Sequence, residues 1–160
     1  MIRPLRETEY ELLNLFLYEA IFVPAGMEPP PRSILRRPEL QVYVSGFGAE
    51  PADTVWAAEE DGQVVGAAWA RIMDGYGQID SQTPSLAVSL LPEYRSRGIG
   101  TALLTALVSA VKEKNFPQIS LSVQKENRAY GLYRRAGFEV IRETEEEYIM
   151  VKDLRKRTQS

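Results

Sequence analysis

The chain has 160 residues, 44% hydrophobic and 26% charged, which is the composition of one globular domain with room for a core. Lysine and arginine number 19 and aspartate and glutamate 22, and a net charge of −3 argues against a nucleic-acid partner. The chain has no cysteine and no histidine. Their absence excludes disulfides, zinc sites of the Cys/His type, Cys–His dyads and Ser–His–Asp triads, so we expect no metal site of that kind.

The apolar stretch near the N-terminus, Leu12–Val23, does not have the pattern of a targeting segment. It is interrupted by Asn14 and Glu19 and follows three glutamates, whereas a signal peptide has a cationic lead and a clean apolar run. No stretch of the sequence, this one included, reaches the roughly 18 apolar residues of a membrane span. We therefore expect a cytoplasmic protein with no membrane partner, which the lack of cysteine fits.

The N-terminal region predicts a short strand followed by a helix. Residues 2–5 form the expected strand, and Thr8 and Glu11 have the spacing of a capping box before an apolar run of helical period. The helix should end by Val23, because the following Pro24 disfavours helical geometry in the residue before it.

A proline-rich segment, Pro24–Pro38, follows this helix and predicts a loop of partly polyproline character. Such a loop is either a stiff connector or, because long ordered loops often carry function, a wall of a substrate cleft. A short helix over residues 39–45 should follow it.

Three strands are expected next. Residues 54–59 and 64–73 flank Asp61-Gly62, a typical hairpin turn, and residues 84–91 form a third, mostly apolar strand.

The remaining pattern alternates helices and strands. A helix opens at Gly98 and ends near Asn115, a strand covers residues 119–123, and a second helix covers residues 127–136. Strands over residues 138–142 and 147–152 should pair through an acidic turn.

The resulting order is β-α-α-β-β-β-α-β-α-β-β, a mixed α/β arrangement rather than a uniform doubly wound sheet. We expect a single domain over residues 1–152 and a polar C-terminal tail over residues 153–160.

The most informative segment is the glycine-rich turn between the third strand and the helix that follows it. Gly98 and Gly100 would let an anion approach the unpaired amides and positive dipole end of the helix, and Arg95 and Arg97 add positive charge. The turn therefore predicts a phosphate or pyrophosphate site. The alternative, in the absence of other information, is an ordinary strand-to-helix turn.

The details of this turn argue against two common phosphate ligands. A nucleoside-triphosphate loop needs Gly-Lys-Ser/Thr, but Gly100 is followed directly by Thr101. A dinucleotide site needs a third glycine, and Leu103 stands at that position.

Two motifs resemble those of the GNAT superfamily of acetyl-CoA-dependent N-acetyltransferases. The first is Arg95-x-x-Gly98-x-Gly100 after Leu-Pro-Glu-Tyr, similar to the family's pyrophosphate motif. The second, about 30 residues on, is Asn127-x-Ala129-x-x-Leu132-Tyr133-x-x-x-Gly137-Phe138. The element order is also similar over essentially the whole chain, so the resemblance implies the GNAT fold and acetyl-CoA as co-substrate.

The resemblance assigns expected roles to individual residues. Backbone groups of the strand over residues 84–91 would bind the pantetheine arm, where the family's fourth strand separates from its fifth. Amides of the glycine-rich turn would bind the pyrophosphate. Tyr133 would be the general acid and would contact the cofactor. The expected cofactor-binding residues are Val88, Ser89, Leu90, Arg95, Ser96, Arg97, Gly98, Ile99, Gly100, Thr101, Asn127 and Tyr133.

The chain departs from the family at the general base. Relatives often have a glutamate on the fourth or fifth strand. In this chain no carboxylate lies between Asp80 and Glu93, and Ser122 stands at the position on the fifth strand where some relatives have the glutamate. Glu28 or Asp80 could act through water, and an amine that is already neutral would need no strong base.

For the residues that would contact the acceptor, the sequence leaves two alternatives open. Tyr18, Phe22, Trp69 and Tyr76 would either line an acceptor pocket or belong to the core. The acidic run Glu143–Glu147 is either a solvated hairpin or an attractor for a cationic amine.

We expect an enzyme that transfers acetyl from acetyl-CoA to a small-molecule or peptide amine, and, because relatives are often dimers, a homodimer. The alternatives are a catalytically silent acyl-CoA sensor of the same fold and an unrelated phosphate-binding α/β protein.

Overall fold

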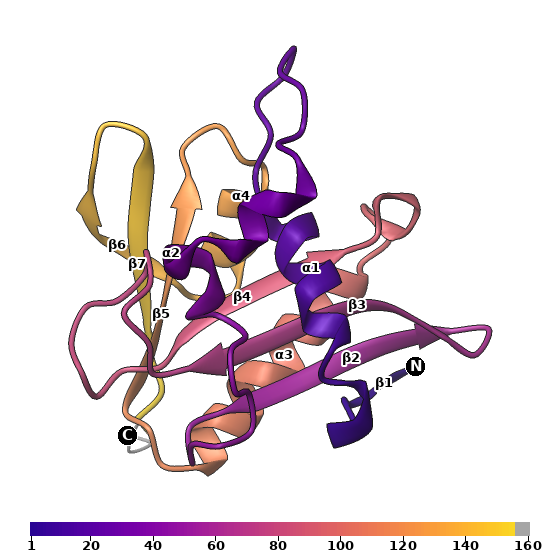
Figure 1. Ribbon diagram of the computed structural model, residues 1–160. Coiled ribbons are helices and arrows are strands. Elements are labelled where there is room, and N and C mark those ends of the chain that lie inside the picture. The colour runs from indigo at the N-terminus through magenta and orange to yellow at the C-terminus, as the bar shows by residue number, and fades with distance from the viewer. Residues whose placement is uncertain (156–160) are drawn as a thin grey trace.

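The computed structural model describes residues 1–155 and arranges them as a seven-stranded mixed sheet with helices on both faces (Figure 1). The strands are β1 (Ile2–Pro4), β2 (Thr54–Glu60), β3 (Gln63–Arg71), β4 (Ser85–Leu90), β5 (Gln118–Gln124), β6 (Glu139–Glu143) and β7 (Glu147–Asp153). The helices are α1 (Leu12–Ala20), α2 (Pro38–Gln41), α3 (Ile99–Glu113) and α4 (Ala129–Arg135), with 3₁₀ turns η1 (Glu7–Glu9), η2 (Arg32–Arg36) and η3 (Pro92–Tyr94).

The strands lie in the order β1-β2-β3-β4-β5-β7-β6. All neighbours are antiparallel except β4 and β5, which are parallel. The predicted element order and mixed sheet are therefore confirmed. The hairpin between β2 and β3 is confirmed as well, since Asp61 and Gly62 have positive φ angles of 51° and 79°, as a two-residue type I′ turn requires.

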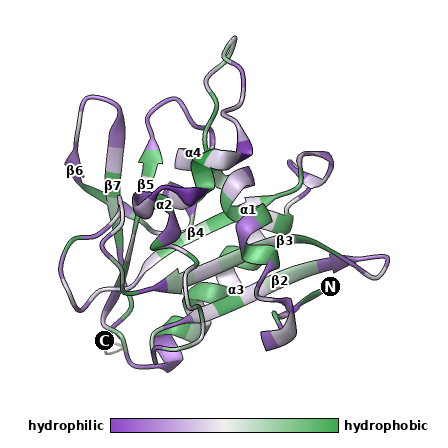
Figure 2. Cartoon of the chain, viewed as in Figure 1, coloured by the Kyte–Doolittle hydropathy of each residue, from purple (hydrophilic) through white to green (hydrophobic). Residues whose placement is uncertain are grey.

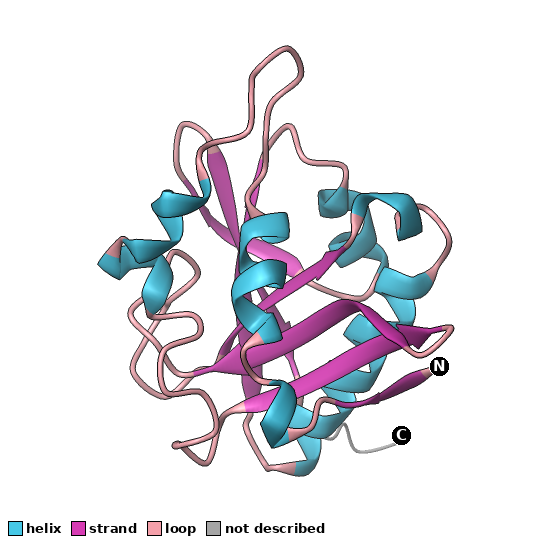
Figure 3. Ribbon diagram, turned by 45° about the vertical axis from the view of Figure 1, so that its right-hand side comes forward, coloured by secondary structure: helices cyan, strands magenta, loops and turns pink. Residues whose placement is uncertain are grey.

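Apolar residues are concentrated in the middle strands and in the helices beside them (Figure 2), and their buried side chains form one cluster on each face of the sheet. Leu86 and Leu90 of β4 pack with α3, α4 and β5, whereas Ala87 of the same strand faces α1. This alternation follows from the two-residue period of a strand. Figure 3 shows α1 in front of the sheet and α3 behind it.

The start of α1 differs from the prediction. Thr8 and Glu11 form no capping box, because residues 7–9 form η1 and Glu11 makes no side-chain cap. Instead, the carboxylate of Glu9 accepts a hydrogen bond from the Arg6 amide at 2.8 Å and two from the Arg3 guanidinium at 2.9 Å. Glu9 therefore caps η1, and the Thr8–Glu11 pair has no equivalent role at the start of α1.

Two other boundaries shift. The predicted short helix over residues 39–45 is α2 followed by turns. At the C-terminus, Asp153 still belongs to β7, and the buried Leu154 donates its amide to the Pro117 carbonyl. Of the predicted polar tail, residues 156–160 lie outside the described part of the chain. None of the helices within residues 1–155 has the length and hydrophobicity to cross a membrane.

Candidate active site

The sheet opens between its two parallel strands. β4 and β5 are in register only at Ser85 and Ser120, whose hydroxyl oxygens lie 2.9 Å apart, and the two strands then diverge towards their carboxyl ends (Figure 1). The expectation that the fourth strand separates from the fifth is met by this geometry. Beyond residue 85, the edge of β4 that faces β5 pairs with no strand of the described chain, residues 1–155.

The orientation of the β4 backbone decides which groups face this gap. The Leu91 amide donates to the Val65 carbonyl of β3 at 2.9 Å. Because backbone groups of an antiparallel strand alternate between its two edges, Ser89 also faces β3, whereas Val88 and Leu90 face the gap. The hydroxyl of Ser89 donates to the Phe16 carbonyl of α1 at 2.6 Å. Ser89 therefore fastens α1 to the sheet, and only two of the three predicted residues offer backbone groups to a ligand.

The glycine turn lies directly after β4 and opens α3. Gly98 is the N-cap of α3 with φ of 83°, and Ser96 also has a left-handed φ of 64°. The amides of Ile99, Gly100 and Thr101 occupy the first turn of α3, where a helix has no internal acceptor for them. They form, with the positive end of the helix dipole, a place for an anion.

The two arginines of the turn have different environments. The Arg95 side chain donates to the Leu90 carbonyl at 3.2 Å and to a carboxylate oxygen of Glu19 at 3.2 Å, which joins the turn to the end of α1. The exposed Arg97 guanidinium lies 5.3 Å from the centroid of the Tyr94 ring. Of the two, only Arg95 is held by a carboxylate.

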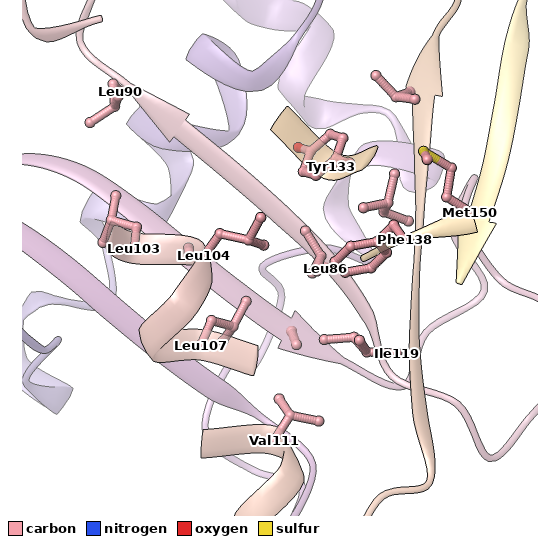
Figure 4. Close-up of a cluster of buried hydrophobic side chains, with 14 of the residues drawn as sticks. Leu86, Leu90, Leu103, Leu104, Leu107, Val111, Ile119, Tyr133, Phe138 and Met150 are labelled. Atoms are coloured by element: carbon pink, nitrogen blue, oxygen red, sulfur yellow. The ribbon is translucent and has the colours of Figure 1, made fainter. Parts of the chain in front are cut away.

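Tyr133 of α4 lies beside the gap. Its ring is buried in the cluster that includes Leu86, Leu90 and Val123, and it meets Phe138 edge to face with centroids 5.9 Å apart. The hydroxyl points away from Phe138 and Met150 (Figure 4) and has no hydrogen-bond partner within residues 1–155. Burial raises the pKa of Tyr133, so the hydroxyl keeps its proton at neutral pH.

Asn127 precedes α4 and has a structural role in addition to the predicted one. Its side-chain oxygen accepts a hydrogen bond from the Ala129 amide at 2.9 Å. This bond satisfies one of the free amides at the start of α4 and leaves the Asn127 side-chain NH₂ free to donate elsewhere.

The two carboxylates suggested as bases lie apart from Tyr133. Glu28 is exposed in the loop that projects from the sheet (Figure 1). Asp80 precedes β4, at the end where β4 and β5 are paired, and accepts a hydrogen bond from the Gln82 amide at 2.8 Å, which lowers its pKa. Asp80 therefore lies at the closed end of the gap, and Glu28 has no hydrogen bond or ion pair within residues 1–155.

The predicted aromatic residues have different environments. Trp69 is fully buried and donates to the Tyr43 carbonyl, so it belongs to the core. The Tyr18 hydroxyl donates to the Pro30 carbonyl, with the Arg32 guanidinium 4.5 Å from the centre of its ring, so Tyr18 ties the proline-rich loop to α1. Phe22 is half-buried just after α1.

Tyr43, which follows α2, was not among the predicted site residues. Its hydroxyl accepts a hydrogen bond from the Tyr76 amide at 3.1 Å, and the two rings have centroids 6.5 Å apart. No local motif marks this contact, because it joins residues 33 positions apart.

A sheet opened between parallel strands, with an anion-binding turn at the end of one of them, is the arrangement of an acyl-CoA-dependent N-acyltransferase fold. The model of the acetyltransferase (GNAT) family matches residues 17–138. The chain belongs to this family.

Relatives and solved structures agree with this membership. An N-alpha-acetyltransferase of Sulfurisphaera tokodaii is 38% identical over 96 residues, 54% of this chain and 57% of that protein. A mycothiol acetyltransferase of Propionibacterium freudenreichii is 33% identical over 93 residues, 58% of this chain and 29% of that protein. The chain thus spans between about a third and three fifths of these curated relatives.

Two solved structures have the same fold. A PaiA N-acetyltransferase from Thermoplasma acidophilum in complex with coenzyme A has a TM-score of 0.69 at 21% identity, covering 96% of this chain and 98% of that one. A phosphinothricin acetyltransferase from Sinorhizobium meliloti in complex with AcCoA has a TM-score of 0.66 at 19% identity, covering 96% and 87%.

Proposed function

We propose that this protein transfers an acetyl group from acetyl-CoA to a primary amine by direct attack of the amine, with Tyr133 as the general acid. The observation that carries the proposal is the Tyr133 hydroxyl, which lies on α4 beside the gap, keeps its proton at neutral pH and has no hydrogen-bond partner within residues 1–155. The residues present fit acetyl-CoA. The α3 amides can donate hydrogen bonds to a pyrophosphate, and the free edge of β4 can bind an extended amide-containing arm.

Each group would have a distinct role. Acetyl-CoA supplies an activated thioester carbonyl. The Leu90 amide, which faces the gap, would donate to the carbonyl oxygen as negative charge develops there, and one such donor contributes ~2.7–4 kcal/mol. Tyr133 would protonate the departing sulfur, and a positioned acid contributes roughly 10²–10⁴-fold in rate.

The names of the relatives support an amine acceptor, since one acetylates an N-terminal α-amine and others are mycothiol acetyltransferases. The second candidate is a catalytically silent acyl-CoA-binding module. It is favoured by the composition of β4 and β5, which carry no carboxylate along the gap.

The test is thermal unfolding with acetyl-CoA, ATP or NAD, followed by thiol release with a panel of amines. Ligand at 100 times its dissociation constant adds ~2.7 kcal/mol to the free energy of unfolding. Stabilisation by acetyl-CoA alone, followed by thiol release with an amine, supports the enzyme. Stabilisation with no turnover supports the silent module, and preference for ATP or NAD contradicts both.

A further inference from the structure

Glu147, the first residue of β7, stands apart from the other glutamates of the acidic run because of where its side chain lies. It is opposite Gln124 of β5 in the antiparallel register, and the Gln124 side-chain amide donates to a carboxylate oxygen of Glu147 at 3.4 Å. Opposite residues of antiparallel strands point to the same face. Since Val123 packs against the α3 and α4 side, Gln124 and Glu147 point to the opposite side, which α1 covers.

The register also places Glu147 along the gap. β4 and β5 are level at Ser85 and Ser120, so five residues along each parallel strand bring Leu90 level with Lys125. Glu147 is opposite Gln124, the residue before Lys125. It is therefore near the height of the Leu90 amide, one strand beyond the gap. The carboxylate lies at the open end of the sheet, on the opposite face from Tyr133.

The Glu147 carboxylate has no positively charged partner among the described residues. Glu143, in the neighbouring strand, pairs with Lys125 at 2.6 Å. Glu147 is half-buried, and within residues 1–155 no lysine or arginine nitrogen lies within ion-pair distance of it. Burial raises the pKa of Glu147, and the adjacent Glu146 raises it further. A partly desolvated carboxylate without a cation is costly, and a bound cation would remove that cost.

Tyr43 lies on the same side of the sheet within the field of this carboxylate. Burial is the main cause that raises the pKa of Tyr43 to about 12, and the charge of Glu147 contributes to the same shift. Tyr43 packs near the exposed ring of Tyr76. An aromatic surface beside a carboxylate is a combination that suits an organic ammonium group.

We propose that Glu147 binds the ammonium group of a cationic amine acceptor and makes the enzyme selective for such acceptors. The inference rests on the proposed acetyl transfer and adds the class of its substrate. Glu147 holds the acceptor in its ammonium form on the α1 side of the sheet, at the height of Leu90. The nitrogen loses a proton to solvent before it attacks the thioester, which reaches the gap from the side of α3 and α4.

The experiment measures thiol release by the full chain with 2-phenylethylamine, spermidine, glucosamine and an alanine-initiated tripeptide. The best acceptor is then compared between wild type, Glu147→Gln and Glu145→Gln, a control with the same charge change at an exposed position of the turn. Glu147→Gln should raise the KM for the amine about tenfold or more and change kcat less than twofold. Glu145→Gln should change neither more than twofold.

A competition readout separates cation recognition from folding. The trimethylammonium analogue of the acceptor should inhibit wild type and not Glu147→Gln, whereas the neutral alcohol should inhibit neither. Glu147→Asp, which keeps the charge, should restore most of the inhibition. Thermal unfolding with acetyl-CoA should be the same for all variants.

The outcomes distinguish the two proposals. Equal KM values and equal inhibition in Glu147→Gln and wild type would overturn the role of Glu147 and leave acetyl transfer intact. Binding of acetyl-CoA by wild type without turnover of any amine would overturn both.

Discussion

At the scale of single residues, Tyr133 has a buried ring and a hydroxyl that is not fully enclosed and has no hydrogen-bond partner in the described part of the chain. Replacing it by phenylalanine removes no hydrogen bond and keeps the edge-to-face contact with Phe138. Tyr133→Phe should therefore change the free energy of unfolding by less than about 0.5 kcal/mol. Its kcat should fall roughly 100-fold or more, because the departing thiolate loses its acid.

Steady-state kinetics and thermal unfolding measure these two effects separately. The stabilisation by acetyl-CoA should be the same in Tyr133→Phe and wild type. A variant with full kcat would show that another group, such as water, protonates the sulfur.

Glu9 gives a residue-scale prediction about pH. Hydrogen bonds from Arg3, and then from the Arg6 amide, lower the pKa of Glu9 to about 2, against about 4.3 in the unfolded chain. A lowered pKa stabilises the folded state above the unfolded value and loses this effect as the pH falls towards the folded value. Glu9→Gln should cost about 1 kcal/mol at pH 7, because its side chain is 20% exposed and screened by solvent.

Thermal unfolding of wild type and Glu9→Gln between pH 7 and pH 3 checks this prediction. The difference between them should be constant down to about pH 5 and shrink below it. A constant difference down to pH 3 would assign the effect of Glu9 to packing rather than to charge.

The sequence could predict the roles of residues whose conformation is determined by their neighbours in the chain. Gly98 needs its left-handed φ within the turn itself, and its motif was visible for that reason. The role of Ser89 could not be predicted, because its bond to the Phe16 carbonyl depends on how α1 crosses β4. Glu147 is indistinguishable from its acidic neighbours until the register with β5 shows which face it occupies.

At the scale of elements, the two glycines of the strand-to-helix turn have different reasons to be glycine. A Cβ on Gly98 would meet open space but be strained by the φ of 83°. A Cβ on Gly100 would make only ordinary contacts, at 3.8 Å and beyond, so the protein itself does not require this glycine. The approach of an anion to the α3 amides would require it.

Gly98→Ala should therefore lower the free energy of unfolding by about 1 kcal/mol or more, whereas Gly100→Ala should leave it unchanged or raise it slightly. Gly100→Ala should instead weaken acetyl-CoA binding about tenfold or more. Calorimetric titration and thermal unfolding of both variants check this contrast. Unchanged acetyl-CoA affinity in Gly100→Ala would place the pyrophosphate elsewhere.

Element types and order were predictable because apolar periods and turn residues mark them locally. The start of α1 was not, since the residue that caps this region is Glu9, which accepts from the Arg6 amide at the start of η1 and is held by Arg3 of β1. The end of β7 was not either, because the pairing of Asp153 with Gln118 and the burial of Leu154 depend on the sheet.

At the scale of the whole molecule, the sheet consists of two halves joined along a very short parallel contact. The amides of Val88 and Leu90 point away from β3 into the gap, where the described chain offers them no strand partner. The register directs the amides of Ala87 and Ser89 towards β3. Native-state hydrogen exchange should therefore alternate along β4, with slow exchange at residues 87 and 89 and fast exchange at residues 88 and 90.

Acetyl-CoA should slow exchange at Val88 and Leu90, because its extended arm would bind as a strand partner on this edge, and should leave Ala87 and Ser89 unchanged. Exchange followed by NMR with and without acetyl-CoA measures each amide. The same experiment with ATP is the control, since a phosphate ligand without the arm would protect only the α3 amides. If acetyl-CoA protected the turn alone, the gap would be a feature of the sheet and not the site of the thioester.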